Sequence, residues 1–400
     1  MAVFLFYFDG PLCVLTEKRI ASVKYALSGK AHAKFSKDTA ISNWPDFIPT
    51  TFFNQYRFNK QTSIMLYLLS FVLKISLSSS NHLTCIKHND KKNYLALDCY
   101  ITDPINSNDC KEGMLTCNDC NQTYPIIDGI AIIVNNFVEY CSERMITFGK
   151  WLLEVESDKL KNFLKDIVAG IDKRNIKDNK YENDGLYYQS YKWLHNENFE
   201  SDKFLHLLRW KIKPSDIYRK LAASVIYNPE GMGLDLGCAL GLSTFEIAKK
   251  FAFVVGVDTS FSFIKEARKK SRDLGITNTE FLVSDILNLP FKNQKFDLIF
   301  GLNIIEFVPI NRLLEAAHNL LKPHCTFIIT SPYDYNRENV YEQKMDDILM
   351  RKTIEKNGFE ISHRTQNESF IPWMLKINER TYLFYFLDFI EAKKISKHKF

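Results

Sequence analysis

From residue 231 onward, apolar strand-like runs alternate with amphipathic helical stretches, and this alternation is the strongest constraint on the fold. The predicted strands are residues 233–236, 253–257, 281–283, 296–300 and 326–330. Strand–helix alternation of this kind is typical of an α/β fold, in which a parallel sheet is covered by helices on both faces.

Two further strand candidates, 360–375 and 381–392, follow a helix that Gly358 ends. The five residues between them are too few for a crossover helix, so the two strands are expected to pair antiparallel. The sequence therefore predicts five parallel strands followed by a C-terminal antiparallel hairpin.

A glycine-rich turn follows the first predicted strand. Gly237 and Gly241 allow a tight reversal at the carboxyl end of the strand and a close approach of ligand atoms to the backbone. Asp258 ends the next strand, where a carboxylate accepts hydrogen bonds from both hydroxyls of a ribose. The spacing does not fit the glycine pattern of dinucleotide-binding folds, and Asp235 before the first glycine favours a cationic or zwitterionic ligand over a polyphosphate.

With these motifs, residues 231–392 resemble a class I S-adenosyl-L-methionine (AdoMet)-dependent methyltransferase of the type-11 group. Ala239 stands where the family's motif usually has its middle glycine, and residues 281–291 and 296–309 match the third- and fourth-strand motifs. The resemblance implies a seven-stranded, mostly parallel Rossmann-like sheet. It also implies cofactor-binding roles for Asp235, Gly237, Cys238, Gly241, Asp258, Thr259, Ser284, Asp285, Ile286 and Asn303.

No catalytic residue is assigned from the sequence. Methyl transfer from a sulfonium is an in-line displacement for which positioning is the main requirement, so a general base need not be visible. Relatives carry an acidic residue followed by histidine near the pocket mouth, whereas this chain has Glu306 followed by Phe307. Relatives that methylate the amino group of adenine or the amide of glutamine carry two prolines after the residue at this position. Asn303 is not followed by these prolines, so adenine and glutamine amide are disfavoured as acceptors.

Two cysteine motifs, residues 83–89 and 115–121, match one another. Each places two potential ligands three residues apart, and the set Cys85, His88, Cys117 and Cys120 fits a closed structural zinc site; unconnected thiols and an imidazole are the alternative. Residues 63–134 resemble the small zinc-ribbon proteins that activate RNA and release-factor methyltransferases. Four protein ligands leave no open coordination position, so the metal is expected to fold the module and to do no chemistry.

The sequence divides into five predicted regions. They are an unassigned extension at 1–62, a β-rich zinc-ribbon-like module at 63–137 that begins with a Leu-rich helix, a helical linker or cap at 138–228, the methyltransferase domain at 229–394 and a basic tail at 395–400. The aromatic residues Tyr187, Tyr188, Tyr191 and Trp193 fall in the linker, where relatives place a helical cap, although ordinary packing explains them nearly as well.

Composition sets the remaining expectations. Nine cysteines at mostly irregular spacings indicate a reducing compartment, hence a cytoplasmic protein, and no membrane span is predicted. A net charge of +5 does not argue for RNA as a partner. The leading hypothesis is methylation of a small-molecule acceptor; an RNA methyltransferase and a catalytically inactive AdoMet-binding scaffold are the alternatives, and the oligomeric state is not predicted.

Overall fold

The computed structural model describes residues 83–395, apart from internal gaps, and before them only 4–6 and 13–15. The gaps are 89–93, 105–108, 173–175, 177–178, 183–184, 196–201, 208–210, 212, 214 and 336–343. The chain forms two compact units, Met1–Ser76 and Leu77–Phe400. In the first unit, β1 (Phe4–Phe6) pairs antiparallel with β2 (Cys13–Leu15). The predicted Leu-rich helix at 63–77 and the rest of the extension at 1–62 lie outside the described residues.

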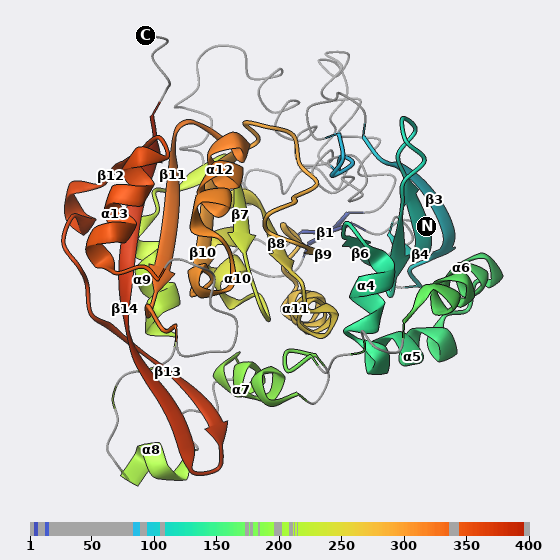
Figure 1. The fold of residues 1–400 in the computed structure, drawn as a ribbon, viewed down its shortest axis with the longest axis horizontal. Coiled ribbons are helices and arrows are strands. Elements are labelled where there is room, and N and C mark those ends of the chain that lie inside the picture. Colours follow the sequence, from blue (N-terminus) through green and yellow to red (C-terminus); the bar gives the residue numbers. More distant parts are fainter. Residues whose placement is uncertain are drawn as a thin grey trace, which may run out of the picture. The chain divides into compact units, whose positions relative to one another are not determined.

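The second unit is built on five parallel strands, which confirms the prediction of an α/β fold. In sheet order they are β9 (Thr279–Ser284), β8 (Phe251–Asp258), β7 (Asn228–Leu236), β10 (Phe296–Leu302) and β11 (Leu321–Ser331). The buried parts of these strands are mostly apolar because both faces of the sheet are covered. Figure 1 shows these strands side by side within the second unit.

Helices cover both faces of these strands. On one face, α12 (Ile310–Leu320) and α13 (Asp347–Lys356) share a hydrophobic core with Leu234, Val255 and Ile299. On the other face, α9 (Asp216–Ser224) and α10 (Leu242–Ala248) pack with Val254 and Phe300. The alternation of strand side chains between the two cores is the period-2 pattern of a pleated strand.

Helix α11 (Phe261–Asp273) connects β8 to β9, and its start is fixed by a local cap. The Ser260 hydroxyl accepts a hydrogen bond from the Phe263 backbone amide, which otherwise has no partner in the first turn. The helix ends before Gly275, whose φ of +66° suits a residue without a Cβ. The helix therefore begins immediately after the carboxyl end of β8, next to Asp258.

The predicted C-terminal hairpin is confirmed, with different bounds. β13 (Ile371–Asn378) pairs antiparallel with β14 (Thr381–Lys394), and the segment predicted as one strand at 360–375 is divided into β12 (Phe359–Ile361), a short 3-10 helix η5 (His363–Thr365) and β13. The break has a tertiary cause: the buried carboxylate of Asp388 accepts hydrogen bonds from Ser369 and Arg351, which bends the chain between the two strands.

The register of β14 places the hairpin at the carboxyl edge of the sheet. Asp388 lies opposite Ser331, the last residue of β11, so residues 381–387 run beyond that strand's end. There they pair with β13, and helix α7 (Leu186–His195) packs against β13. Figure 1 shows the hairpin projecting past the parallel strands beside α7.

The sheet is larger than the predicted seven strands. β6 (Ile130–Ile133) pairs parallel with β9, and β5 (Thr123–Ile127), β4 (Cys110–Thr116) and β3 (Ala96–Thr102) continue the sheet antiparallel. All four residues of β6 are buried, so this strand needs neighbours on both sides. By pairing with β9, it covers an edge that would otherwise expose unpaired backbone groups.

The described parts of the segment between β6 and β7 contain helices separated by coil and turns. Its remaining helices are α4 (Phe137–Ser142), α5 (Met145–Glu154), α6 (Asp158–Gly170) and α8 (Lys203–Leu207). None of the helices in the described part of the chain combines the length and the apolar character that crossing a membrane requires.

The C-terminal end of β14 is held against α12, and residues 396–400 of the predicted basic tail lie outside the described residues. Lys394 belongs to β14 and is buried, and its Nζ donates hydrogen bonds to the carbonyl oxygens of His318 and Leu321. These carbonyls lie at the C-terminal end of α12, where an ammonium group is electrostatically favoured.

Candidate functional site

The ten predicted cofactor residues gather at one edge of the sheet. They lie at or just after the carboxyl ends of β7, β8, β9 and β10, which are neighbours in the order β9-β8-β7-β10. Because the strands are parallel, their carboxyl ends meet at the same edge, where ligands of open α/β sheets bind.

The turn after β7 has three residues with left-handed backbone. Gly237 has φ +72°, Ala239 φ +45° and Gly241 φ +85°. At Gly237 an added Cβ would lie 2.7 Å from Ile304 Cγ2, so glycine is needed for space as well as for conformation. Ala239 adopts the conformation that favours glycine, so its backbone follows the course expected of the family's usual middle glycine.

Asp235 is a buried carboxylate with an incomplete set of partners. Its side chain is 1% exposed, and Oδ2 accepts hydrogen bonds from Ser243 Oγ at 2.6 Å and Thr244 Oγ1 at 2.7 Å. Oδ1 is buried and has no hydrogen-bond partner within the described structure. Burial raises the pKa of Asp235 to about 7, and the nearby charge of Asp258 also raises it. The hydrogen bonds from Ser243 and Thr244 lower the pKa but do not offset the effect of burial.

Asp258 is held at the turn by backbone amides. Its Oδ2 accepts a hydrogen bond from the Ala239 amide at 3.0 Å, and its Oδ1 accepts one from the Ser260 amide at 2.8 Å. Burial raises the pKa of Asp258 to about 6, while these two hydrogen bonds lower it. The next residue, Thr259, is exposed, and its carbonyl oxygen accepts a hydrogen bond from Tyr140 Oη at 3.0 Å.

The remaining predicted cofactor residues are placed by local turns. Asp285 accepts hydrogen bonds from the Leu287 amide and from Asn288 Nδ2, both at 2.9 Å, so its carboxylate orders its own turn. Ser284 and Ile286 on either side of it are buried, as is Cys238. Asn303 has φ +59°, and its Oδ1 accepts a hydrogen bond from Thr330 Oγ1 at 2.9 Å.

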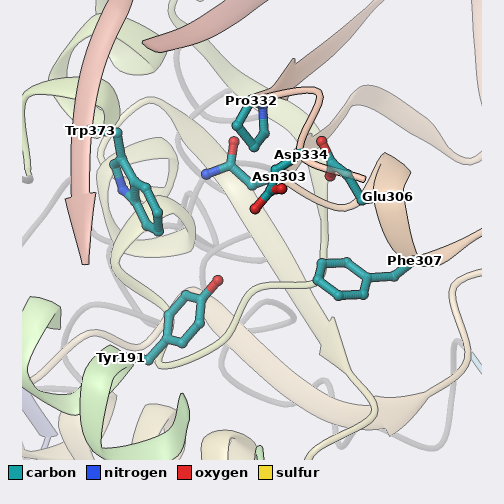
Figure 2. A pocket seen from close by; sticks show the side chains of 7 residues that line it. All are labelled: Tyr191, Asn303, Glu306, Phe307, Pro332, Asp334 and Trp373. Carbon is teal, nitrogen blue, oxygen red and sulfur yellow. The ribbon is translucent and has the colours of Figure 1, made fainter. Parts of the chain in front are cut away.

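A pocket adjoins Asn303 and is shown in Figure 2. It is lined by residues from α7, from the segments after β10 and β11, and from β13: Tyr191, Asn303, Glu306, Phe307, Pro332, Asp334 and Trp373. Glu306 and Trp373 are 5% and 4% exposed, whereas the other five lining residues are partly exposed. Three aromatic rings and two carboxylates therefore meet beside the predicted cofactor residues.

Helix α7 joins the glycine-rich turn to this pocket. Tyr188 packs with Ala239, Leu240 and Phe263 in one hydrophobic cluster, and Tyr191 packs against the same cluster. The Tyr191 ring centroid lies 5.5 Å from that of Phe263 and 6.5 Å from that of Trp373. The predicted aromatic segment thus packs at the carboxyl edge of the sheet, and its role as a cap stays a prediction.

A buried ion pair that the sequence did not indicate fixes this cap. Glu182 and Arg144 are 4% and 6% exposed, and their Oε1 and Nε atoms are 3.0 Å apart. Glu182 also accepts hydrogen bonds from the Phe261 and Ser262 amides at the first turn of α11. Because α11 begins beside Asp258, this pair connects the linker to the predicted cofactor site. The two residues are 38 positions apart, so no local pattern could have revealed it.

The predicted metal ligands converge, although they come from two separate segments. The ligand atoms of Cys85, His88, Cys117 and Cys120 all lie within 4.8 Å of one another. Cys85 Sγ and Cys120 Sγ are 3.8 Å apart, and ligands of a tetrahedral zinc ion at ~2.3 Å would be separated by about 3.8 Å. His88 Nε2 is buried and lacks a hydrogen-bond partner within the described residues. This donor set fits a zinc ion.

The cluster is anchored to the parallel sheet. The Thr84 amide donates a hydrogen bond to the Pro290 carbonyl oxygen at 2.8 Å, and Lys292 Nζ lies 3.6 Å from the centroid of the Tyr94 ring. Cys85 and Cys117 share one hydrophobic core with Leu289. These contacts make the cluster part of the second compact unit.

The four strand ends also fit AdoMet. The buried Asp235 has one oxygen without a partner, and two carboxylates with raised pKa values lie at the glycine-rich turn. A cationic ligand at this turn would stabilise their ionised forms.

Comparison with known proteins agrees with this geometry. A family model described as a methyltransferase domain matches residues 229–383. Ubiquinone biosynthesis O-methyltransferase of Coxiella burnetii is 35% identical over 91 residues, which are 22% of this chain and 38% of the relative. Sterol 4-C-methyltransferase strm-1 of Caenorhabditis elegans is 25% identical over 112 residues, 28% of this chain and 33% of the relative. The chain spans between 33% and 38% of the length of these two relatives.

Among solved structures, geranyl diphosphate C-methyltransferase from Streptomyces coelicolor A3(2) is similar, with 14% identity and a TM-score of 0.36. The similarity covers 46% of this chain and 77% of that chain. The family match shows that residues 229–383 form a methyltransferase domain. This domain contains the five parallel strands and all ten predicted cofactor residues.

Proposed function

We propose that this protein is an AdoMet-dependent methyltransferase that acts on a small molecule. The observation that carries the proposal is that residues 229–383 match a methyltransferase domain. It is supported by the ten predicted cofactor residues, which lie near one another at the carboxyl edge of the parallel strands. The pocket beside Asn303 supports a small acceptor over RNA, because two of its seven lining residues, Glu306 and Trp373, are almost fully buried.

In this proposal the chain's own residues bind and orient. Asp258 accepts the ribose hydroxyls, Asp235 supplies negative charge beneath the glycine-rich turn, and Asn303 marks the boundary between the cofactor and the acceptor. AdoMet supplies an activated methyl group when bound, so the main task of the protein is to hold the acceptor in line with it. Helix α7 and the β13–β14 hairpin exclude water from the pocket.

Equilibrium binding of AdoMet, measured by isothermal titration calorimetry, tests the cofactor assignment. We expect saturable binding to the full-length chain and at least a tenfold weaker affinity for Asp258→Ala. Asp166→Ala, on the exposed face of α6, is the matched control and should bind as the wild type does. The assignment is contradicted if the wild type does not bind AdoMet, or if Asp258→Ala binds AdoMet as tightly as Asp166→Ala does. Transfer of labelled methyl from AdoMet into fractionated cell extract then identifies the acceptor.

We propose further that Cys85, His88, Cys117 and Cys120 hold a structural zinc ion. The convergence of the four ligand atoms and the partnerless buried His88 Nε2 support this site. Four protein ligands complete a tetrahedron, so the ion would stabilise the strands β3–β6 and the contact of Thr84 with Pro290, and would have no catalytic role.

Metal analysis of protein purified without chelator tests the zinc proposal. We expect close to one zinc ion per chain, and a large loss of zinc in Cys117→Ser. Cys99→Ser removes an exposed cysteine of the neighbouring strand β3 and should keep the metal. A zinc content near zero in the wild-type protein would refute the site.

A further inference from the structure

We propose that Cys99 and Cys110 are a modification site, at which they form a reversible disulfide between β3 and β4. Both cysteines are free, and neither belongs to the four ligands of the proposed zinc site. This modification does not depend on methyl transfer. It is carried by the pairing of the two strands and by the space beside Gly113.

The register of β3 and β4, which are neighbouring antiparallel strands in Figure 1, brings the two thiols together. Cys99 lies opposite Gly113, and Cys110 precedes Gly113 on the same strand. Cys99 Sγ donates a hydrogen bond to the Ile101 carbonyl oxygen at 3.4 Å. Cys110 Sγ donates one to the Glu112 carbonyl oxygen at 3.1 Å. Because the strands run in opposite directions, each thiol leans along its own strand toward the other.

Gly113 provides the space in which the two side chains meet. A Cβ added at Gly113 would lie 2.7 Å from Cys110 Sγ and 3.2 Å from Cys99 Cα. Residues directly opposite one another in an antiparallel pair carry their side chains on the same face. Cys110 Sγ therefore fills the place of the missing side chain, on the face from which the Cys99 side chain projects. A disulfide requires Cβ atoms ~3.8 Å apart, which cysteines on one face of neighbouring strands can meet.

The two cysteines differ in exposure, and this difference assigns them different parts in the reaction. Cys99 is exposed and Cys110 is half-buried. Burial raises the pKa of Cys110, and a side-chain hydrogen bond with Cys99 raises it further, so the Cys110 thiol stays protonated and is a poor first nucleophile. Cys99 is therefore the thiol that a dissolved oxidant meets first, and Cys110 resolves the product.

A metal site is the alternative chemistry for a pair of thiols. A tetrahedral zinc site takes four ligands. Within the described part of the chain, the zinc cluster is the only group of three or more potential metal ligands, so Cys99 and Cys110 have no third ligand there. Oxidation to a disulfide needs no third group, and in a reducing compartment such a disulfide is transient.

The oxidant is a small-molecule disulfide, oxidised glutathione. Cys99 loses its proton to solvent, and its sulfur attacks one sulfur of that disulfide, releasing a first glutathione thiolate that takes up a proton. Cys110 then attacks the Cys99 sulfur, and its proton goes to the second glutathione, which leaves as a thiol. Two cysteine thiols are oxidised to one disulfide while one glutathione disulfide is reduced to two thiols. An excess of reduced glutathione reverses both steps.

The connection closed by this disulfide already contacts α11 at both ends. Asp103 lies 3.2 Å from Arg272, and Asp109 lies 3.8 Å from Arg268. A cross-link restricts the unfolded chain while leaving such folded contacts in place. Oxidation should therefore leave the melting temperature unchanged or raise it by a few degrees, and a fall on oxidation would contradict the geometry.

Thiol mapping of the full-length protein tests the site. The folded protein is incubated with oxidised glutathione, its remaining thiols are blocked with N-ethylmaleimide, and its tryptic peptides are analysed by mass spectrometry. No Lys or Arg lies between Cys99 and Cys110, so trypsin leaves both in one peptide, residues 93–111. We expect this peptide to lose two hydrogen atoms and to carry neither glutathione nor N-ethylmaleimide. A peptide that keeps both thiols, or that carries glutathione in place of the disulfide, overturns the proposal.

Serine variants test the order of the steps. In Cys110→Ser, Cys99 should stop at the mixed disulfide with glutathione. In Cys99→Ser, Cys110 should react with oxidised glutathione at least ten times more slowly than Cys99 does in Cys110→Ser, and equal rates refute the assigned order. Cys325→Ser, which removes a partly buried cysteine of β11, is the control and should form the disulfide as the wild type does. Thermal melting confirms folding; if a serine variant does not fold, the wild-type peptide decides.

Discussion

Asp235 makes the stability of the ligand-free protein depend on pH in a direction opposite to that of most carboxylates. The residue is 1% exposed, and burial raises its pKa to about 7, compared with about 3.9 in an unfolded chain. Below pH 4 both states hold the proton. Between pH 4 and pH 7 the folded state keeps a proton that the unfolded state has released, so stability falls as pH rises.

The magnitude follows from the size of the shift. A difference of about 3 between the folded and unfolded pKa values corresponds to about 4 kcal/mol of the free energy of unfolding. This contribution is lost above pH 7. Asp235→Asn keeps an oxygen for the hydroxyls of Ser243 and Thr244 and cannot ionise, but it leaves one buried amide donor without a partner, which costs about 1 kcal/mol or more. We therefore expect the variant to be about 3 kcal/mol more stable than the wild type at pH 8, and slightly less stable at pH 4.

Urea unfolding at pH 4, 6 and 8 without AdoMet, followed by tryptophan fluorescence, measures this difference. Asp166→Asn on the exposed face of α6 controls for the loss of one carboxylate. The reasoning is refuted if the difference between Asp235→Asn and the wild type does not grow with pH. Saturating AdoMet should reverse the order at pH 8, because a cationic ligand stabilises the carboxylate and not the amide.

Three other perturbations have outcomes that the structure specifies. Ala239→Gly relieves a left-handed backbone of φ +45°, so urea unfolding should show equal stability or a gain of up to about 1 kcal/mol, with AdoMet affinity retained; a clear loss of stability would contradict the assigned conformation. Glu182→Ala leaves Arg144 buried without its partner and should destabilise by about 3–5 kcal/mol, more than Glu182→Gln does, in the same assay. Chelation of zinc should lower the melting temperature of the wild type and expose residues 83–134 to limited proteolysis, and it should have no effect on Cys117→Ser.

The sequence predicted those parts of the fold that depend on local patterns. Apolar runs separated by helical stretches predicted the five parallel strands, because a strand buried on both faces is apolar throughout. The turn from Asp235 to Gly241 was predicted by its glycines, and the structure gives both of them positive φ values. The bounds of the last strands were wrong, since the break before Ile371 depends on the buried Asp388, which comes later in the chain.

Contacts between distant residues could not be predicted in this way. The pairing of β6 with β9 extends the sheet beyond seven strands. The sequence of a short apolar segment does not indicate which sheet edge the segment joins. Trp373 reaches Tyr191 only because the register of β14 carries the hairpin past the end of β11. The ten predicted cofactor residues and the four predicted zinc ligands keep their proposed roles, for which the structure supplies supporting positions.

The sequence by itself determined the glycine-rich turn, the carboxylates at the strand ends and the paired cysteine motifs, since each depends on residues within a few positions of one another. Only the tertiary structure decided which aromatic rings and carboxylates line the pocket beside Asn303, and that Glu182 pairs with Arg144. The physical reason is that sheet register and helix packing bring together residues far apart in the chain, and the free energy of those contacts has no local signature.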